Sequence, residues 1–397
     1  MNALFIGLDR SLCDPRTDYA LNTKARESYL AQFFDHYAVL ILTPKQPGLA
    51  PVVRTSGMAI YATLSQSYAT MIPDAVRIGL EIHRECPLNL ITVQDPLLTG
   101  LAGYFLKKRL NIPLHVQIHA DYLDNPFWLQ ESALNRWYNR LGKAVLRKAN
   151  AVTAVHPDIA AKIRAIIKIP TIPVTNLPYG LGIDTRFFLG PAEPDFRSLW
   201  LAQRFRRVIF FAGRLSLQKN LAELIRAIPI ILQRFPKTLF VLAGEGDQKN
   251  SLLALARELG IEDHVHSAGF ISDIRMPSAY QSSDIVVLPS FYEGHARTLM
   301  EAGVSGVPIV STPVTGTKDI IQGAFNGRVA TSFKALDLAA ALMDILANHQ
   351  HYHTNAQSLK HSLAQQFDYR CNIADWAKQI QHTTMPYDHE FVANTLR

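Results

Sequence analysis

Residues 284–316 constrain this chain more than any other stretch. They open with a short apolar, β-branched run at 285–288, of the length expected for a buried parallel strand. Pro289 ends that run, residues 297–304 have the apolar spacing of a helix, and 307–312 is the next apolar strand. The stretch therefore predicts a strand–loop–helix–strand turn. Open α/β sheets bind ligands at the carboxyl ends of such strands, so a ligand site is expected in this loop.

Two carboxylates lie in this turn, Glu293 in the loop and Glu301 in the helix. Helical rise separates them by about 8 Å if the helix begins near Ala296. That spacing leaves open an inverting glycosidase pair, whose carboxyl groups stand about 6.5–9.5 Å apart. It suits a long ligand better, because the free N–H groups from Gly294 to Arg297 form an anion site between them. A nucleotide-sugar has this shape. The alternative is two solvated glutamates that the helix dipole favours.

The residues around the two glutamates resemble a known family. The signature of the retaining glycosyltransferases of family 4, the group 1 transferases, is similar to four groups of residues here: Glu293-Gly294, Glu301-Ala302, Gly306-x-Pro308 and Thr312-x-x-x-Gly316. Three upstream segments resemble further motifs of that family in the same order: 176–187, 211–220 and 241–246. Several motifs in order and at the right spacing make this resemblance specific.

The resemblance implies an α/β protein of the GT-B fold, with two Rossmann-like, doubly wound parallel-sheet domains that face a cleft. A chain of 397 residues is long enough for two domains. We expect an acceptor-binding domain at 1–183 and a nucleotide-sugar-binding domain at 184–367. The segment 368–397 would hold a helix that crosses back to the first domain, and then a tail. Apolar strands that alternate with helical segments independently predict parallel sheets.

The apolar pattern predicts the main elements of each half. In the first half the strands are 1–8, 39–43, 90–94, 114–121 and, as the last, 151–156. The helices there are 23–34, 75–85, 98–110 and 158–167, and 44–55 is a loop. In the second half the strands 207–212, 238–243 and 264–270 precede the turn described above, and the helices are 221–235, 335–347 and 369–381.

For the transferred sugar, the resemblance implies contacts with the side chains of His119 and Glu293. A lone histidine at a strand end is otherwise a structural residue, and we interpret His115 in that way. The loop after Glu293 would add contacts, largely through its backbone, from Gly294, His295, Ala296 and Arg297.

For the nucleotide diphosphate, Arg214 and Lys219 flank a predicted strand–turn–helix corner, where two cations are suited to clamp the phosphates. The resemblance assigns them that role. The alternative, two surface cations at a helix start, opposes the dipole preference. The resemblance also places Glu301 on the ribose hydroxyls. Four further residues would lie near the donor or its base: Gly213, Gly244, Phe270 and Ile271.

The implied enzyme is a retaining, metal-independent hexosyltransferase. It would move a sugar from a UDP- or GDP-type donor to a glycan or lipid-linked acceptor, in the synthesis of cell-surface polysaccharide or glycolipid. The donor is a substrate, and we expect no further cofactor. The chain has no Asp-x-Asp sequence, so we expect no metal. Three alternatives stay open: a nucleotide-sugar epimerase, a synthase or phosphorylase that acts on a soluble sugar, and a binding module without turnover.

The net charge of +7 is concentrated in the first half, where residues 1–190 hold 20 Lys and Arg against 14 Asp and Glu. No aromatic-plus-basic nucleic-acid motif is present, so we expect no nucleic-acid partner. Residues 127–148 combine aromatic and basic side chains, which predicts one of two arrangements. One is peripheral contact with an anionic membrane. The other is a helix packed on the sheet through Trp137, Leu141, Val145 and Leu146. Three dispersed cysteines and the lack of a basic leader predict a cytoplasmic protein, at the inner membrane face if that contact forms.

Overall fold

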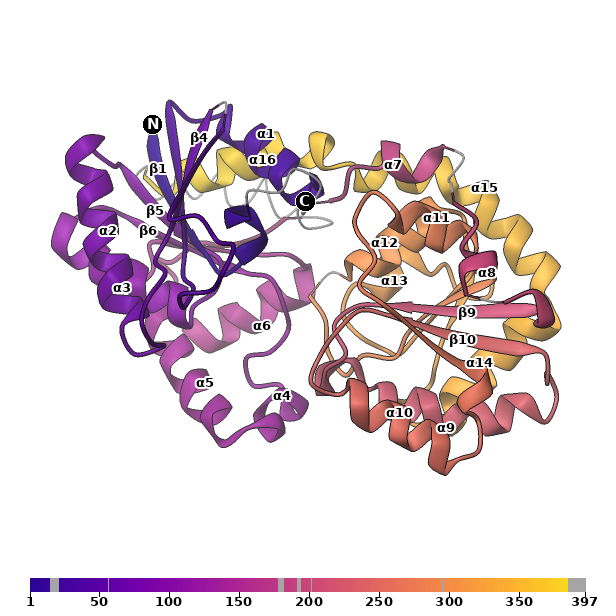
Figure 1. The fold of residues 1–397 in the computed structure, drawn as a ribbon. Coiled ribbons are helices and arrows are strands. Elements are labelled where there is room, and N and C mark those ends of the chain that lie inside the picture. Colours follow the sequence, from indigo (N-terminus) through magenta and orange to yellow (C-terminus); the bar gives the residue numbers. More distant parts are fainter. Residues whose placement is uncertain are drawn as a thin grey trace. The chain divides into compact units, whose positions relative to one another are not determined.

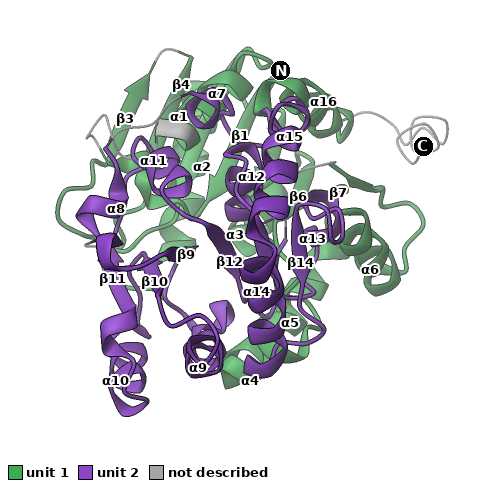
Figure 2. Ribbon diagram, turned by 90° about the vertical axis from the view of Figure 1, so that its right-hand side faces the viewer, with its two compact units in different colours: residues 1–181, 369–397 green, residues 182–368 purple. Residues whose placement is uncertain are grey.

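The structure is a computed structural model that describes residues 1–14, 21–55, 57–177, 182–190, 194–200, 202–294 and 296–384 (Figure 1). The chain divides into two units, coloured separately in Figure 2. Unit 1 comprises Met1–Leu181 and Tyr369–Arg397, and unit 2 comprises Gly182–Asp368. Each unit is a largely parallel sheet with helices on its faces.

Within the described residues, unit 1 contains an eight-stranded sheet in the order β3-β4-β2-β1-β5-β6-β7-β8. Paired strands run parallel except at one edge, where β3 is antiparallel to β4. The strands are β1 Asn2–Gly7, β2 His36–Ile41, β3 Val52–Thr55, β4 Met58–Ala62, β5 Leu90–Val93, β6 Leu114–Ile118, β7 Ala151–Ala154 and β8 Val174–Asn176. The helices are α1 Leu21–Ala31, α2 Met71–Glu85, α3 Leu98–Leu110, α4 Pro126–Glu131, α5 Ala133–Leu146, α6 Pro157–Ile167 and α16 Tyr369–His382.

Strand β1 shows that both faces of this sheet are buried. Leu4 and Ile6 belong to a cluster that includes side chains of α2, α3, α5 and α6. Ala3 and Phe5 point to the other face and join a cluster with α1 and α16. Because both faces are covered, the strand is a continuous apolar run and does not alternate with polar residues.

The C-terminal helix α16 forms part of the core of unit 1. Ile373, Trp376 and Ile380 are almost fully buried. Burial of an isoleucine of this kind stabilises a fold by about 1.5–3 kcal/mol. The rings of Tyr29 on α1 and Tyr369 on α16 meet edge to face at 5.7 Å, and Figure 1 shows the two helices side by side.

In the part of the chain that the structure describes, unit 2 contains a six-stranded parallel sheet in the order β11-β10-β9-β12-β13-β14. In Figure 1, α9, α10 and α14 lie on one side of β9 and β10, and α11, α12 and α13 lie on the other. The strands are β9 Arg207–Ala212, β10 Thr238–Ala243, β11 Val265–Gly269, β12 Ile285–Leu288, β13 Ile309–Ser311 and β14 Gly327–Val329. The helices are α7 Arg186–Leu189, α8 Phe196–Leu199, α9 Leu221–Leu232, α10 Lys249–Glu258, α11 Met276–Gln281, α12 Arg297–Val304, α13 Thr317–Ile320, α14 Ala335–Ala347 and α15 His349–Phe367.

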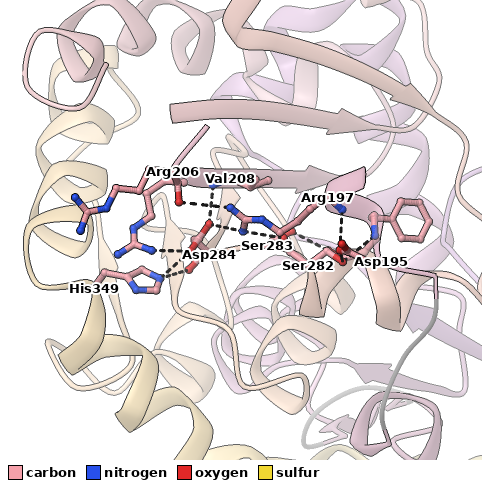
Figure 3. A network of polar contacts seen from close by, with 11 residues as sticks. Asp195, Arg197, Arg206, Val208, Ser282, Ser283, Asp284 and His349 are labelled. Atoms are coloured by element: carbon pink, nitrogen blue, oxygen red, sulfur yellow. Dashed lines mark hydrogen bonds and ion pairs between the residues drawn. The ribbon is translucent and has the colours of Figure 1, made fainter. Parts of the chain in front are cut away.

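A polar network around Asp284 fastens the amino ends of β9 and β12 (Figure 3). The Asp284 carboxylate accepts hydrogen bonds from Arg197 Nη1 at 2.9 Å, Arg207 Nη1 at 3.0 Å and the Val208 N–H at 2.8 Å. His349, at the start of α15, lies within 3.5 Å of the same carboxylate. Ligands of such sheets bind at the opposite, carboxyl ends of the strands, so this network is structural.

Two predictions about the first half are wrong. Residues 44–55 are not all loop, since Val52–Thr55 is strand β3, and 151–156 does not hold the last strand, since β8 follows it. β3 is mostly exposed, and β8 spans three residues with only Val174 buried. Edge strands of this kind are defined by pairing with a neighbour, so they carry little apolar pattern of their own.

The structure of segment 127–148 also differs from the predicted alternative of one helix that packs on the sheet through Trp137. It contains two helices, because Ser132 ends α4 and its Oγ accepts a hydrogen bond from Leu134 N at 3.2 Å to cap α5. Val145 and Leu146 are buried as expected, whereas Trp137 is 54% exposed. Packing of Trp137 on the sheet is therefore excluded.

Candidate functional site

Backbone hydrogen bonds hold together the carboxyl ends of β9, β10 and β11. Gly213, Gly244 and Gly269 lie at these ends with φ of 153°, 136° and 67°. The Gly213 N–H donates to Ala243 O at 3.0 Å, and the Gly244 N–H donates to Gly269 O at 2.7 Å. A Cβ on Gly244 would lie 2.0 Å from Gly213 O. The close approach of these two backbone segments therefore requires glycine at 244, and it leaves an edge of bare backbone at the strand ends.

Beside this edge, Lys219 and Glu293 form an ion pair. Lys219 Nζ lies 2.5 Å from Glu293 Oε1, and the side chains are 15% and 11% exposed. Gln218 fixes the loop that carries Glu293: its carbonyl accepts from the Phe291 N–H at 2.9 Å, and its Nε2 donates to Tyr292 O at 2.9 Å. The two predicted residues thus meet each other directly.

Arg214 stands apart from that pair. It follows Gly213 directly, and its side chain is exposed. Hydrogen bonds from Leu215 N to Glu245 O and from Gln248 N to Leu215 O, both 3.0 Å, hold the neighbouring backbone. No described residue forms an ion pair or hydrogen bond with the Arg214 guanidinium. Arg214 is thus a cation available to a ligand.

Glu301 is the centre of a second buried cluster. Its Oε1 accepts from Arg297 Nε at 2.6 Å, and its Oε2 accepts from the Tyr280 hydroxyl at 2.8 Å. Asp273 lies 3.6 Å from the far side of the guanidinium. Burial raises the pKa of Glu301, although Arg297 acts in the opposite direction. A carboxylate has about four acceptor positions, so Glu301 keeps positions for ligand hydroxyls.

The first turn of α12 lies between Glu293 and Glu301 in the sequence. Ala296 occupies its N-cap and provides no side-chain cap. Thr298 Oγ1 donates to Ala212 O at 3.1 Å, which ties this turn to the end of β9. Uncapped N–H groups and the helix dipole both favour an anion here. Gly294 and Ala296 are buried, and the predicted contact His295 lies outside the described residues.

Phe270 and Ile271 follow β11, next to the glycine edge. Phe270 is 58% exposed, which is unusual for so large an apolar side chain, and Ile271 is half-buried. An aromatic side chain in this place provides a surface on which a planar base can stack.

In unit 1, His119 follows directly after β6. Its Nε2 lies 2.7 Å from Gln117 Oε1. Burial, and then the positive charge of Arg26, lower the pKa of His119 to about 4, so the imidazole is neutral at physiological pH.

The sequence patterns missed Tyr280 and Asp273, which complete the Glu301 cluster. Neither belongs to a motif: Tyr280 reaches Glu301, and Asp273 reaches Arg297, only because α11 and the segment before it pack beside α12. Among the described residues, no group of three or more His, Cys, Asp or Glu side chains is placed to hold a metal ion. No described helix is both long and apolar enough to span a bilayer.

Two family models match this chain. Residues 197–360 match the model of the glycosyl transferases group 1, and residues 31–180 match that of a glycosyl transferase 4-like domain. The chain belongs to the group 1 glycosyltransferases. Members of this family use nucleotide-sugar donors.

Relatives of this group 1 glycosyltransferase differ in what they act on. An uncharacterised glycosyltransferase of Methanocaldococcus jannaschii is 38% identical over 133 residues, which is about a third (34%) of each chain. The α-D-kanosaminyltransferase of Streptomyces kanamyceticus is 27% identical over 68% of each chain. The α-monoglucosyldiacylglycerol synthase of Streptococcus pneumoniae is 24% identical over 74% of this chain and 67% of that protein.

Solved structures establish the GT-B fold of this glycosyltransferase. Sucrose-phosphate synthase from Thermosynechococcus elongatus has a TM-score of 0.80 at 18% identity, over 96% of this chain and 99% of that chain. HepE from Anabaena, in complex with UDP and glucose, has a TM-score of 0.73 at 17% identity, over 96% and 99% of the two chains. The predicted α/β fold of two Rossmann-like domains is therefore confirmed.

Proposed function

We propose that this group 1 glycosyltransferase moves a hexose, with retention and without a metal ion, from a UDP- or GDP-sugar to a glycan or lipid-linked acceptor. One observation carries the proposal. The uncapped start of α12 lies between two buried carboxylates, Glu293 and Glu301, in the chain, and the free cation Arg214 extends from the adjoining glycine edge. A diphosphate flanked by a ribose and a sugar matches that order of anion site and acceptors.

In this proposal each part of the site binds one part of the donor. Arg214, Lys219 and the α12 N–H groups bind the diphosphate and stabilise the charge that develops as it departs. The bare backbone at Gly213 and Gly244 lets the phosphates approach closely. Glu301 accepts from the ribose hydroxyls. Glu293, the 294–297 loop and His119 contact the sugar. Phe270 and Ile271 contact the base.

Lys219 and Glu293 need not separate for this to work. The ammonium of Lys219 has three N–H donors and uses one on Glu293, so two remain for phosphate oxygens. The paired carboxylate likewise keeps acceptor positions for sugar hydroxyls. The ion pair therefore fixes both groups before the donor binds, which lowers the ordering cost of binding.

The donor is tested by thermal shift with UDP, GDP, ADP, CMP and their common sugar conjugates. A ligand that binds only the folded state at a hundredfold excess over its dissociation constant stabilises it by about 2.7 kcal/mol. We expect one diphosphate family to raise Tm, and Arg214→Gln and Glu301→Gln to weaken the shift. Arg257→Gln, an exposed arginine on α10, is the matched control. A folded protein that responds to no diphosphate would overturn the proposal.

The reaction is tested with the donor so identified, in the presence of EDTA. We expect transfer to a glycan or lipid-linked acceptor to continue, with the anomeric configuration of the donor kept in the product. Interconversion of the donor sugar without any acceptor product would show an epimerase. Product on a soluble sugar alone would show a synthase, and binding without turnover a binding module.

We also propose that α5 contacts an anionic membrane, where a lipid-linked acceptor would lie. Leu134 and Trp137 are 62% and 54% exposed on this helix. Arg136 and Arg140 are exposed on the same helix, and Arg147 and Lys148 are exposed just beyond its C-terminal end. An exposed apolar pair on a helix that also exposes cations suits a headgroup interface.

This contact is tested by sedimentation with phosphatidylglycerol vesicles and with phosphatidylcholine vesicles. We expect binding to the anionic vesicles alone, reduced in Trp137→Ser. Leu336→Ser, which removes an even more exposed apolar side chain (68%) from unit 2, should bind as the wild type does. Equal binding by the wild type and Trp137→Ser would contradict the contact through α5.

A further inference from the structure

A continuous chain of side-chain hydrogen bonds runs through unit 1 from His119 to the C-terminal helix. It passes from β6 to β5, back to β6, and then across β7 and β8 to α16. The successive contacts are His119 Nε2 to Gln117 Oε1 (2.7 Å), Gln117 Nε2 to Thr92 Oγ1 (3.0 Å), Thr92 Oγ1 to His115 Nδ1 (2.9 Å), His115 Nε2 to Thr153 Oγ1 (2.8 Å), Thr153 Oγ1 to Thr175 Oγ1 (3.0 Å) and Thr175 Oγ1 to Gln379 Oε1 (3.1 Å).

Most of this chain is inaccessible to water. Thr92 and His115 are fully buried, and Gln117, Thr153 and Gln379 are at most 9% exposed. Buried polar groups of this kind must satisfy one another, because each unmade hydrogen bond costs the full desolvation of the group. The direction of every bond in the chain is therefore coupled to the direction of its neighbours.

Gln379, the last residue in this series of hydrogen bonds, fixes the direction of donation along it. Gln379 Nε2 lies 3.4 Å from Asn176 O, and a carbonyl oxygen can only accept, so the amide nitrogen must face it. Gln379 Oε1 then faces Thr175, whose hydroxyl donates to it. A hydroxyl has one proton, so Thr175 must accept from Thr153. By the same reasoning Thr153 accepts from His115 Nε2.

The direction continues through the histidines. Burial, and then the charge of His119, lower the pKa of His115 to about 3, so it carries one ring proton. That proton is on Nε2, and Nδ1 accepts from the Thr92 hydroxyl. Thr92 in turn accepts from Gln117 Nε2. Gln117 Oε1 therefore faces His119, and His119 Nε2 must donate to it.

We propose that Gln379 acts through this chain to hold His119 as the Nε2-protonated tautomer, so that Nδ1 presents a lone pair to a hydroxyl of the bound sugar. The inference rests on the proposed function for its ligand, a hydroxylated sugar, but the tautomer itself does not. Gln379 and Thr175 are thus positioning residues. Reversal of these hydrogen bonds would place the proton of His119 on Nδ1, and it would turn Gln379 Oε1 toward Asn176 O, so that two acceptors face each other.

The tautomers can be read directly from long-range proton–nitrogen NMR spectra of protein labelled with 15N-histidine, without any ligand. His119→Gln and His115→Gln assign the two signals. In the wild type we expect Nε2–H for both rings. A wild-type His119 protonated on Nδ1 would overturn the proposal.

Substitution of Gln379 tests its control of the chain. Gln379→Leu removes the fixed acceptor, so the Thr175 hydroxyl can donate either to Val152 O, 3.5 Å away, which keeps the wild-type direction, or to Thr153 Oγ1, which reverses it. We expect the His119 signal to become a mixture of tautomers, with a fall in kcat/KM of up to about tenfold, the equivalent of one hydrogen bond. Gln379→Glu keeps an acceptor for Thr175, and its neutral form can also donate to Asn176 O. It should keep the wild-type tautomer and rate.

A matched control separates the chain from docking of the helix. Gln381, also on α16, donates from Nε2 to Phe33 O at 2.7 Å and lies outside the chain. Gln381→Leu should leave both tautomers unchanged. An equal effect of Gln381→Leu, or no effect of Gln379→Leu, would overturn control by Gln379. A tautomer shift in Gln379→Leu with unaltered kinetics would overturn the role of Nδ1 toward the sugar, whatever donor the enzyme uses.

Discussion

Lys219 Nζ and Glu293 Oε1 lie 2.5 Å apart, in a pair whose side chains are at most 15% exposed. Arg214, predicted to work beside Lys219, is exposed and has no ion pair among the described residues. The two predicted phosphate ligands thus differ in their surroundings. Lys219 neutralises a buried carboxylate, whereas Arg214 neutralises no described group.

Substitution of the two cations should therefore have different costs. Arg214→Gln should lower turnover and leave the free energy of unfolding within about 0.5 kcal/mol of the wild type. Lys219→Met should lower turnover and also cost about 3–5 kcal/mol of stability, because Glu293 is left as a lone buried charge. Urea unfolding and initial rates measure both effects. Restored stability in the double variant Lys219→Met/Glu293→Gln would confirm the cause, and equal stability of the two single variants would contradict it.

Tyr280→Phe should destabilise unit 2 by about 1–3 kcal/mol, since Glu301 Oε2 loses a buried donor at 2.8 Å. It should also weaken the nucleotide-induced rise in Tm, because the orientation of Glu301 is less fixed. Thermal unfolding with and without the nucleotide measures both. Tyr68→Phe, at a residue that is 74% exposed, is the control. A Tyr280→Phe protein as stable as this control would show that the hydroxyl contributes nothing.

Gly244→Ala should abolish folding or cost more than about 4 kcal/mol, because its Cβ would lie 2.0 Å from Gly213 O. Gly260→Ala provides a matched control, since Gly260 also has a positive φ (65°) but nothing lies within 4 Å of the added Cβ. It should cost about 1–2 kcal/mol, the strain of left-handed backbone alone. Soluble yield and urea unfolding compare the two. Similar losses would mean that contact with Gly213 is relieved by a small backbone shift.

Stability should fall in acid because of His115. Its pKa is lowered to about 3 by burial and by His119, whereas an unfolded histidine titrates near 6.5. Between these values the unfolded chain binds the additional proton. The stability that neutral His115 contributes is thus complete above pH 6.5. About 1.4 kcal/mol of the free energy of unfolding is lost for each unit that the pH falls from 6.5 toward 3. Urea unfolding from pH 7.5 to 4.5 measures this slope.

His115→Gln should flatten that dependence on pH even though it lowers stability at neutral pH. His361→Gln is the control for loss of an exposed histidine. A slope equal in wild type and His115→Gln would show that another group governs acid unfolding.

Much of the fold could be predicted because its central elements carry their own apolar patterns. The strands at 207–212 and 238–243 and the helix at 335–347 have the predicted bounds. The edge strands β3, β8 and β14 went unpredicted, because only pairing with a neighbour makes them strands. The motifs likewise pointed to Glu293, Glu301, Arg214 and Lys219, since those residue types suit a diphosphate and its hydroxylated flanks.

By itself, the sequence determined the GT-B fold and the group 1 family, because apolar periodicity and motif spacing are properties of neighbouring residues. Only the tertiary structure decided how the site residues are partnered: Lys219 with Glu293, and Glu301 with Tyr280 as well as Arg297. It also brought together the side chains from which we infer the tautomer of His119. Gln379 lies 204 residues beyond Thr175 in the sequence, yet their side chains meet. A buried donor takes whatever acceptor the packing of distant segments brings to it, and no local pattern encodes that choice.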